Sequence, residues 1–456
     1  KKTALTIEER LQQALVPAEE QPYEVPENWV WTYISSGFDV TSSKRVHKSD
    51  WLSEGIPFYR TRELVKLSEQ GYVDNELFIS EDLYKTFKKE FGVPQKNDLL
   101  ISGVGTIGVP YVISDEKEFY FKDGNVIWLK NKGVFDASYM YYLYKTVFID
   151  NQIHSMSAGT TVDTYTIINA KNTIIPLPPL SEQQRIVERI EELFAKLDEA
   201  KERLQEVADS FAVRKAAILH KAFTGELTKQ WRRENGVSDE SWEESNFGKF
   251  TVSQYGYTEK AHWEKIGPKF LRITDIQDNK VDWDEVPWCP IDEDGMKQYA
   301  VEIGDIMIAR TGATTGKSYL ICDDVEAVFA SFLIRLKVVN KNLDYNYLYG
   351  YMQSEDYWRQ ITDFSSGIAQ PGVNASKLKQ IKFKCPTLPE QHEIVRLIDD
   401  LLARERAAQQ AAEQALASID LMKKSILARA FRGELGTNKA SEASALKLLQ
   451  QVLAEN

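Results

Sequence analysis

The sequence predicts an α+β protein with two globular domains separated by two long antiparallel coiled-coil helices, arranged as a pseudo-twofold internal repeat. Three observations indicate this fold class: one segment occurs twice, each copy carries an apolar heptad seam, and strand-like runs precede each copy. The 456 residues are 43% hydrophobic and 11% aromatic, so there is enough apolar material for more than one packed core.

The repeat is the first of these observations. The segment that begins at Pro178 reads PPLSEQQRIVERIEELFA, and the segment that begins at Pro386 reads PTLPEQHEIVRLIDDLLA. Without a gap, residues 178–227 and 386–435 share 19 identities in 50 positions, where chance would give roughly 3. Upstream of these segments the similarity is faint. A similar part and a divergent part in each half indicate a shared mechanical role and two different recognition roles.

The similar part of each half is predicted to be a long helix. Spacings of four and three alternate along the first copy, at Ile186, Ile190, Leu193, Leu197, Ala200, Leu204, Val207 and Phe211. The second copy has an alanine-rich seam at Ile394, Ile398, Leu401, Glu405, Ala408, Ala412, Ala415 and Ile419. Residues 181–224 would form one helix about 65 Å long. We expect the two helices to pair antiparallel within the chain; the alternative is that each packs only on its own globular domain.

The divergent parts are rich in β-branched and aromatic runs, such as NVIWLK and FASFLIRLKVV, which predict short strands. Aromatic segments such as ASYMYYLYKTVFIDNQI predict helices between them. The predicted boundaries are an N-terminal segment at 1–26, a first globular domain at 27–178, a first spacer helix at 179–235, a linker with a second globular domain at 236–385, and a second spacer helix with the C-terminal segment at 386–456.

Charge and cysteine content narrow the class of protein. The net charge of −12 argues against a protein that coats nucleic acid or an anionic membrane through bulk charge, but a local site remains compatible with it. The domain at 27–178 has 16 basic and 19 acidic residues, a balance of only −3. Cys289, Cys322 and Cys385 form no paired motif, which favours a reduced compartment. With neither a membrane-span pattern nor a signal-peptide pattern, we expect a soluble, cytoplasmic protein that does not bind membranes.

The sequence contains no pattern typical of a catalytic or metal site. The GxSxG, HExxH and paired-cysteine motifs are all missing, and the five histidines are scattered. The run RTGATTGKSYL at 310–320 resembles a phosphate loop, but only three residues separate Gly312 from Gly316 where that loop requires four. A tight glycine turn between strands is the better interpretation. We therefore expect no enzyme activity and no metal, and an ATP-dependent enzyme is the weakest alternative.

Basic residues cluster locally in both divergent parts, mixed with serine, threonine and aromatic residues. Arginine donates hydrogen bonds in a fork to guanine, and lysine, serine and threonine contact phosphate. Any one of these cations could equally be a solvated surface charge. The Gly/Ser/Thr loops at 157–163 and 365–372 could be recognition loops or plain turns. The candidate DNA-binding residues are Lys44, Arg45, Lys48, Arg60, Arg62, Thr106, Thr160, Thr161, Arg272, Thr274, Arg310, Thr311, Thr314, Lys317 and Gln370.

These motifs together resemble the specificity subunit of type I restriction–modification enzymes. The resemblance is carried by the two proline-plus-EQ helix starts, by the AFTGEL and AFRGEL helix ends, and by GDIMIARTGATTG in the second half. It covers essentially the whole chain. The first half departs from it with NDLLISGVGTIG, which leaves its equivalent of Arg310 undefined.

The resemblance implies a non-catalytic subunit with two target recognition domains. Each domain would read one half of a bipartite, asymmetric site on double-stranded DNA, and the helices would set the spacing and dock two DNA adenine methyltransferase subunits. S-adenosylmethionine would be bound by those partners, with no cofactor in this chain, and restriction–translocase subunits would complete the assembly in a bacterial or archaeal cytoplasm. The alternative is a coiled-coil scaffold whose two domains bind proteins, which the acidic charge favours slightly.

Overall fold

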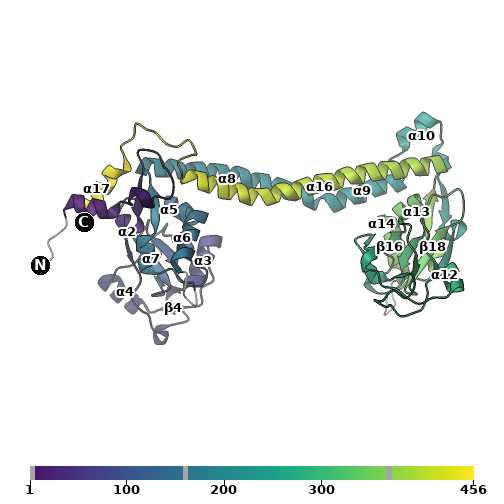
Figure 1. Ribbon diagram of the computed structural model, residues 1–456, viewed down its shortest axis with the longest axis horizontal. Helices are drawn as coiled ribbons and strands as arrows, with labels where there is room; N and C mark the ends of the chain where they lie inside the picture. Colours follow the sequence, from purple (N-terminus) through teal and green to yellow (C-terminus); the bar gives the residue numbers. More distant parts are fainter. Residues whose placement is uncertain (1–5, 158–162, 366–371, 456) are drawn as a thin grey trace. The chain divides into compact units, whose positions relative to one another are not determined.

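The computed structural model describes residues 6–157, 163–365 and 372–455 (Figure 1). It divides into two compact units, the first formed by Lys1–Arg203 with Ala415–Asn456 and the second by Leu204–Gln414. Three predicted DNA-binding residues, Thr160, Thr161 and Gln370, lie outside the described residues.

The first unit contains an α+β domain that follows the N-terminal helix. Its strands are β1 (Val30–Tyr33), β2 (Phe38–Thr41), β3 (Ile56–Tyr59), β4 (Phe78–Ile79), β5 (Leu99–Ser102), β6 (Pro110–Val112), β7 (Tyr120–Phe121), β8 (Val126–Asn131) and β9 (Ile174–Leu177). Its helices are α1 (Ile7–Ala14), α2 (Ile34–Gly37), α3 (Thr61–Gln70), α4 (Glu81–Glu90), α5 (Ala137–Tyr144), α6 (Val147–Ser157), α7 (Ile167–Asn172) and the C-terminal α17 (Ala445–Glu455), with 3-10 turns η1 (Ala18–Glu20) and η2 (Lys48–Asp50).

The second unit contains a second α+β domain. Its strands are β10 (Glu243–Asn246), β11 (Thr251–Tyr255), β12 (Lys269–Leu271), β13 (Ile276–Gln277), β14 (Lys280–Val281), β15 (Ile306–Ala309), β16 (Ser318–Leu320), β17 (Ala327–Phe329), β18 (Leu333–Val338) and β19 (Lys382–Cys385). Its helices are α10 (Lys229–Asn235), α11 (Phe247–Phe250), α12 (Glu293–Tyr299), α13 (Tyr345–Tyr351), α14 (Glu355–Ser365) and α15 (Ala375–Lys379), with 3-10 turns η3 (Asp239–Ser241), η4 (Ile273–Asp275), η5 (Trp283–Glu285) and η6 (Gly312–Thr314).

The two domains repeat one strand topology. An antiparallel sheet with strand order β2-β8-β5-β6 in the first corresponds to β11-β18-β15-β16 in the second. The antiparallel pair β1-β9 corresponds to β10-β19, and the parallel pair β3-β7 corresponds to β12-β17. The segments around Phe78 and Trp288 also correspond, since each exchanges backbone hydrogen bonds with the loop before β3 or β12, and helices α4 and α12 follow them. The hairpin β13-β14 is specific to the second domain and lies where the first domain has α3. The predicted internal repeat therefore extends through the divergent domains.

The long helices are α8 (Leu180–Asp209), α9 (Phe211–Phe223) and α16 (Leu388–Ala430). In the first unit, Ile190 of α8 shares a core with Leu427 of α16, and Lys423 Nζ lies 2.5 Å from the carboxylate of Asp198. The contact later in α8 is made to an earlier residue of α16, so the two helices are antiparallel there. In the second unit the pairing is also antiparallel, since Arg214 of α9 meets Glu405 at 2.5 Å while later turns of α9 share a core with earlier turns of α16. The predicted antiparallel pair is confirmed within each unit.

Two details of the helix prediction were wrong. The first copy is not one helix over 181–224, because it breaks at Ser210. The Ser210 hydroxyl and Arg214 Nη2 both donate to the carbonyl of Val207, at 3.0 and 3.2 Å, and compete with the backbone amide that would continue the helix. Two predicted seam positions, Val207 in the first copy and Ala408 in the second, are exposed and do not lie in the seam.

The repeated Glu-Gln pair at the helix starts joins each long helix to its own domain. Gln183 accepts from the backbone amide of Asp136 at 2.7 Å and donates to two carbonyls at 3.0 and 3.1 Å. Gln391 makes the same set, accepting from the amide of Asp344 at 2.8 Å and donating to carbonyls at 2.8 and 2.9 Å. Both glutamines are buried. The motif therefore satisfies backbone groups where a domain meets its helix.

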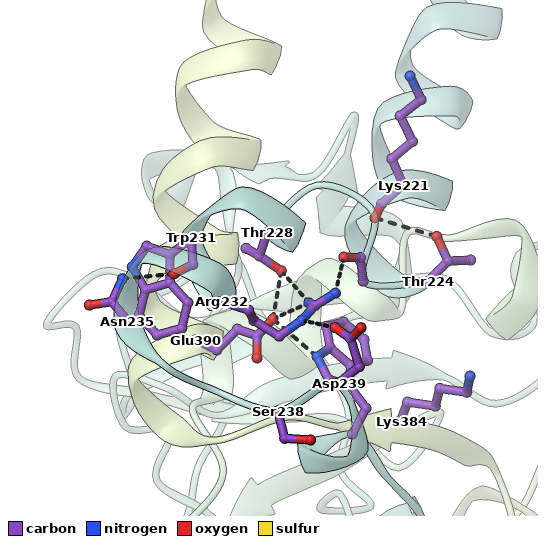
Figure 2. A network of polar contacts seen from close by, with 12 residues as sticks. Lys221, Thr224, Thr228, Trp231, Arg232, Asn235, Ser238, Asp239, Lys384 and Glu390 are labelled. Carbon is purple, nitrogen blue, oxygen red and sulfur yellow. Dashed lines mark hydrogen bonds and ion pairs between the residues drawn. The ribbon is translucent and has the colours of Figure 1, made fainter.

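The glutamate of the pair is also buried in both copies, but its partners differ. Glu390 Oε1 accepts from Arg232 Nη1 and Thr228 Oγ1, both at 2.6 Å (Figure 2). It also accepts from the indole of Trp242 at 3.0 Å. The same arginine donates at 2.8 Å to the carbonyl of Gly225, which lies two residues after the end of α9. This buried ion pair joins the segment after α9 to the start of α16.

Glu182 occupies the matching position in the first unit with neutral partners. Its Oε2 accepts from the Trp29 indole at 2.8 Å and from the Asn438 amide at 2.9 Å, and its Oε1 accepts from Thr437 Oγ1 at 3.4 Å. Burial raises the pKa of Glu182, and these hydrogen bonds offset the effect only in part. The two copies thus solve the burial of one repeated carboxylate in different ways.

Candidate nucleic-acid interface

A glycine turn connects β5 to β6 in the first domain and β15 to β16 in the second, and both pairs are antiparallel neighbours. The predicted turn between strands is confirmed. Gly108 and Gly316 take left-handed conformations with φ of 78° and 86°, and a Cβ on either would lie 2.7 Å from an isoleucine, Ile153 or Ile361. The second turn is one residue longer than the first.

The register of these turns identifies the first domain's equivalent of Arg310 as Gly103. The amide and carbonyl of Gly103 bond Asn125 O at 2.8 Å and Tyr165 N at 2.9 Å. Arg310 makes the same two backbone bonds, to Phe332 O at 3.2 Å and Val373 N at 2.9 Å. At Gly103 a Cβ would lie 2.8 Å from the carbonyl oxygen of Tyr165. Equivalent backbone therefore carries a long cation in one domain and no side chain in the other.

The Arg310 side chain lies against the surface between β11 and the turn before β18. Its Nη1 donates to the carbonyl of Ser331 at 3.3 Å, and Cζ lies 4.9 Å from the ring centroid of Tyr255. Its Nε is buried and has no hydrogen-bond partner among the described residues. Phe332, next to that carbonyl, is exposed. An aromatic face and a carbonyl thus orient the guanidinium at an apolar, accessible surface.

Thr311, Thr314 and Lys317 continue the same turn. Lys317 is exposed, and Thr311 and Thr314 are half-buried. Thr311 also forms an isolated bridge with Gly372, which joins the turn to the segment before α15. The second domain thus brings these predicted residues together with Arg310. In the first domain Thr106 is exposed in the corresponding turn.

A second basic region of the first domain surrounds the turn between β7 and β8. Arg45 Nε donates to Asp123 at 2.9 Å, and the hydroxyls of Ser42 and Ser43 anchor the same loop to backbone carbonyls at 2.7 Å. Lys44 lies with Nζ 5.1 Å from the ring centroid of Phe91, and Lys48 is exposed at the start of η2. The structure connects Arg45 to the β7–β8 turn but places Lys48 in a separate element.

Arg60 and Arg62 surround one carboxylate at the start of α3. Arg60 Nε and Nη2 donate to Glu63 at 3.1 and 2.7 Å, and Arg62 Nε donates to it at 2.6 Å. Arg62 also pairs with Glu76. Burial raises the pKa of Glu63, but the hydrogen bonds from the two arginines outweigh burial, so the pKa is lowered overall and the carboxylate is held ionised.

Arg272 occupies the corresponding place in the second domain, after β12. Its Nε and Nη2 donate to Asp275 at 3.1 and 2.7 Å. Its Cζ lies 5.7 Å from the ring centroid of Trp263, whose side chain is 65% exposed. Thr274 is exposed and corresponds to Arg62 of the first domain.

Sequence reasoning missed the aromatic partners, Tyr255 and Trp263. A single tyrosine or tryptophan in a strand-rich segment has the sequence signature of a core residue, and only the fold shows that these two are exposed beside arginines. Tyr255 lies beside Arg310, and Trp263 beside Arg272, only because the fold brings them together; local sequence spacing does not predict these pairs. The aromatic run around Tyr255 was the available signal.

Among the described residues, no group of three or more His, Cys, Asp and Glu side chains is placed to hold a metal ion. Across 6–157, 163–365 and 372–455, helices that are both long and apolar enough to span a membrane are absent.

The chain is similar to known proteins in both of its halves. A family model described as "Type I restriction modification DNA specificity domain" matches residues 26–209 and 240–415. The type I restriction enzyme EcoBI specificity subunit of Escherichia coli is 24% identical over 445 residues, which cover 92% of this chain and 90% of that protein. The StySPI specificity subunit of Salmonella potsdam is 27% identical over 342 residues, covering 72% and 73%.

Two solved structures share the fold. The crystal structure of the HsdS subunit from Thermoanaerobacter tengcongensis aligns with a TM-score of 0.66 and 19% identity, covering 91% of this chain and 99% of that one. A chain from a structural study of complex assembly and conformational transition of the type I R-M system aligns with a TM-score of 0.61 and 18% identity, covering 91% and 100%.

Proposed function

Because the chain belongs to the family of type I restriction–modification DNA specificity subunits, we propose that each of its two α+β domains reads one half of a bipartite, asymmetric site on double-stranded DNA. Subunits of this family are non-catalytic, and catalysis is carried out by partner subunits. Sequence-specific DNA recognition is therefore the activity that the side chains of this chain must provide.

One observation supports the asymmetric reading most strongly. The two domains repeat the same strands and the same glycine turn, yet the turn presents Arg310 in one and Gly103 in the other. Arginine forms a forked pair of hydrogen bonds with guanine in the major groove, and glycine forms none. Matched backbones with different side chains are suited to reading two different half-sites in one frame.

The antiparallel helices are proposed to set the distance between the half-sites. In each unit the long helix is joined to its own domain through a buried glutamine, Gln183 or Gln391, so a change in helix length would move the domain with it. Dimeric DNA-binding proteins fix half-site spacing geometrically in the same way. Here one chain would provide both halves.

The proposal includes the partners of a complete enzyme. The helices would dock two DNA adenine methyltransferase subunits, which would bind S-adenosylmethionine, while this chain would carry no cofactor. Restriction–translocase subunits would join that assembly in a bacterial or archaeal cytoplasm. With a net charge of −12, this chain would supply sequence choice, and its partners would supply much of the contact with phosphate.

Selection of random duplex DNA tests the proposal. The chain is co-expressed with its methyltransferase, and the complex is used to enrich unmodified duplexes at low salt. We expect two short conserved blocks of different sequence, separated by a gap of fixed length and variable composition. A complex that enriches no sequence, while the chain captures a defined protein, would instead support the protein-binding scaffold.

A further inference from the structure

The two recognition domains share one polar element at the end of their parallel strand pairs. In the first, the backbone amide and Nε of Arg60 donate to one oxygen of Glu63, at 2.9 and 3.1 Å, and Nη2 donates to the other at 2.7 Å. In the second, the amide and Nε of Arg272 donate to one oxygen of Asp275, at 2.8 and 3.1 Å, and Nη2 donates to the other at 2.7 Å. The element is the same bond for bond.

Helix stability does not require an arginine at this position. Arg60 and Arg272 are the N-cap residues of α3 and η4, where serine, threonine, aspartate and asparagine are preferred because their side-chain oxygens accept from the first helical amides. An arginine side chain has no acceptor. The carboxylates of Glu63 and Asp275 bond the N-cap amide whatever residue stands there. Two domains that otherwise diverge have nevertheless kept the arginine.

The carboxylate uses one edge of each guanidinium and leaves the other open. Nε and Nη2 lie against the carboxylate, so the fork formed by Nη1 and the second hydrogen of Nη2 points away from it. Among the described residues no acceptor bonds Nη1 of either arginine. The side chains of Arg60 and Arg272 are 29% and 32% exposed, which is enough for a ligand to reach that fork.

Each of the two arginines lies beside a segment that holds another candidate DNA-binding residue. Beside Arg60, the amide of Lys122, at the β7–β8 turn, bonds the carbonyl of Tyr59 at 2.9 Å, and the same turn holds Arg45 through Asp123. Beside Arg272, the amide of Ala330 bonds the carbonyl of Leu271 at 2.9 Å, and the next residue accepts from Arg310. In both domains the buttressed arginine is therefore adjacent to another candidate DNA contact.

We infer that Arg60 and Arg272, oriented by Glu63 and Asp275, each bind a backbone phosphate of the DNA through the open guanidinium edge, at the same place in the two half-sites. This inference rests on the proposed DNA-binding function. A contact that both domains keep should recognise what two different half-sites have in common, and that is the phosphate backbone. Bidentate binding of phosphate by arginine has the geometry of this open fork.

The test uses the full chain with its co-expressed methyltransferase, and fluorescence anisotropy with two duplexes: the selected sequence and a scrambled one. Arg272→Ala should weaken binding to both duplexes by a similar factor of roughly 10 to 100 and reduce the slope of log K against log salt by about 0.9. Arg272→Lys keeps the charge, so it should keep the slope and lose less affinity. Lys297→Ala is the matched control, because it removes one cation from an exposed i,i+3 ion pair in the same domain. It should change the affinity and the salt slope much less than Arg272→Ala does.

Asp275→Asn separates the orienting role of the carboxylate from its charge. An asparagine oxygen can still accept from the Arg272 amide, but its NH₂ group cannot pair with Nη2. Removing an acidic residue makes the surface more positive, so charge alone predicts tighter binding, as expected for Asp284→Asn, an exposed acid of the same domain. We expect weaker binding for Asp275→Asn, with an unchanged thermal melting profile.

The outcomes separate this inference from the proposed function. If the wild-type complex selects a split motif but Arg272→Ala and Arg60→Ala leave the salt slope unchanged, the phosphate contact is refuted and the function stands. Loss confined to one base position in the selected motif would mean base reading and would also refute it. Tighter binding by Asp275→Asn would refute the orienting role. A wild-type complex that selects no motif would refute the proposed function itself.

Discussion

Replacing Arg232 with methionine should destabilise the start of α16 strongly. The substitution leaves the carboxylate of Glu390 fully buried without its cation, and it also removes the 2.8 Å bond to the carbonyl of Gly225. Removing one member of a buried ion pair costs about 3–5 kcal/mol. The pair with Asp239 adds little, because that carboxylate is 78% exposed. Lowering the free energy of local unfolding by about 3 kcal/mol or more increases the locally unfolded population roughly a hundredfold or more.

Hydrogen exchange followed by mass spectrometry measures this effect where it occurs, which matters because a chain of several domains does not unfold in one step. Peptides covering 228–239 and 388–398 should exchange at least roughly a hundredfold faster in Arg232→Met. The double variant Arg232→Met with Glu390→Met should recover most of the protection, because no unpaired charge then remains buried.

Arg185→Met is the matched control from the first unit. Arg185 pairs with Glu442 at 2.7 Å, but both side chains are about a quarter exposed, so the substitution should cost at most about 1 kcal/mol. The assignment of a buried, structurally required ion pair is refuted by either of two results. In one, hydrogen exchange in peptides 228–239 and 388–398 is no faster in Arg232→Met than in Arg185→Met. In the other, these peptides are no better protected in the double variant than in Arg232→Met.

Three further outcomes follow from the same structure. Glu182→Gln should stabilise the first unit at neutral pH. Because the pKa of Glu182 is raised, the wild-type protein loses stability as the pH rises from the ordinary glutamate pKa through the raised value. The urea midpoints of the two proteins should therefore converge only in acid. Arg310→Ala should relax one position of one half-site by about 1–3 kcal/mol if the guanidinium contacts a base edge, and a uniform loss over all sequences in the random-duplex selection would exclude base reading. Gly316→Ala should lower the free energy of unfolding by about 1–3 kcal/mol, since φ is 86° and the new Cβ meets Ile361 at 2.7 Å. Gly312 also has a positive φ but has open space around it, so Gly312→Ala should cost only the backbone strain. Equal decreases in melting temperature for the two variants would contradict this.

The framework of the fold was predictable because its signals are periodic and repeated. The heptad seam and the ungapped 208-residue offset predicted the antiparallel helix pair, and glycine spacing predicted the β15–β16 turn. The break at Ser210 was not predictable, since it depends on two side chains, Ser210 and Arg214, competing for one carbonyl. Helical periodicity continues through that position and gives no sign of the interruption.

The candidate site was predictable in residue type but not in arrangement. Arg60, Arg272 and Arg310 were selected because basic residues near strand ends suit phosphates and base edges. That Gly103 replaces Arg310 required the hydrogen-bond register, since the two turns differ in length by one residue. That Glu63 orients its arginine required side-chain geometry, since an acid at the third helical position is common at helix starts whatever residue precedes it.

The central claim is that the helix pair sets the gap between two half-sites, and insertion of one heptad at matched positions in α8 and α16 tests it most directly. Seven residues add about 10 Å to a helix, and base pairs rise by about 3.4 Å, so the gap can lengthen by at most about 3 base pairs. In the random-duplex selection we expect both half-site sequences to stay the same while the gap grows within that limit, and a heptad in only one helix either to disrupt the pair or to change the gap. A folded variant with both insertions that selects the original motif with its original gap would contradict the account.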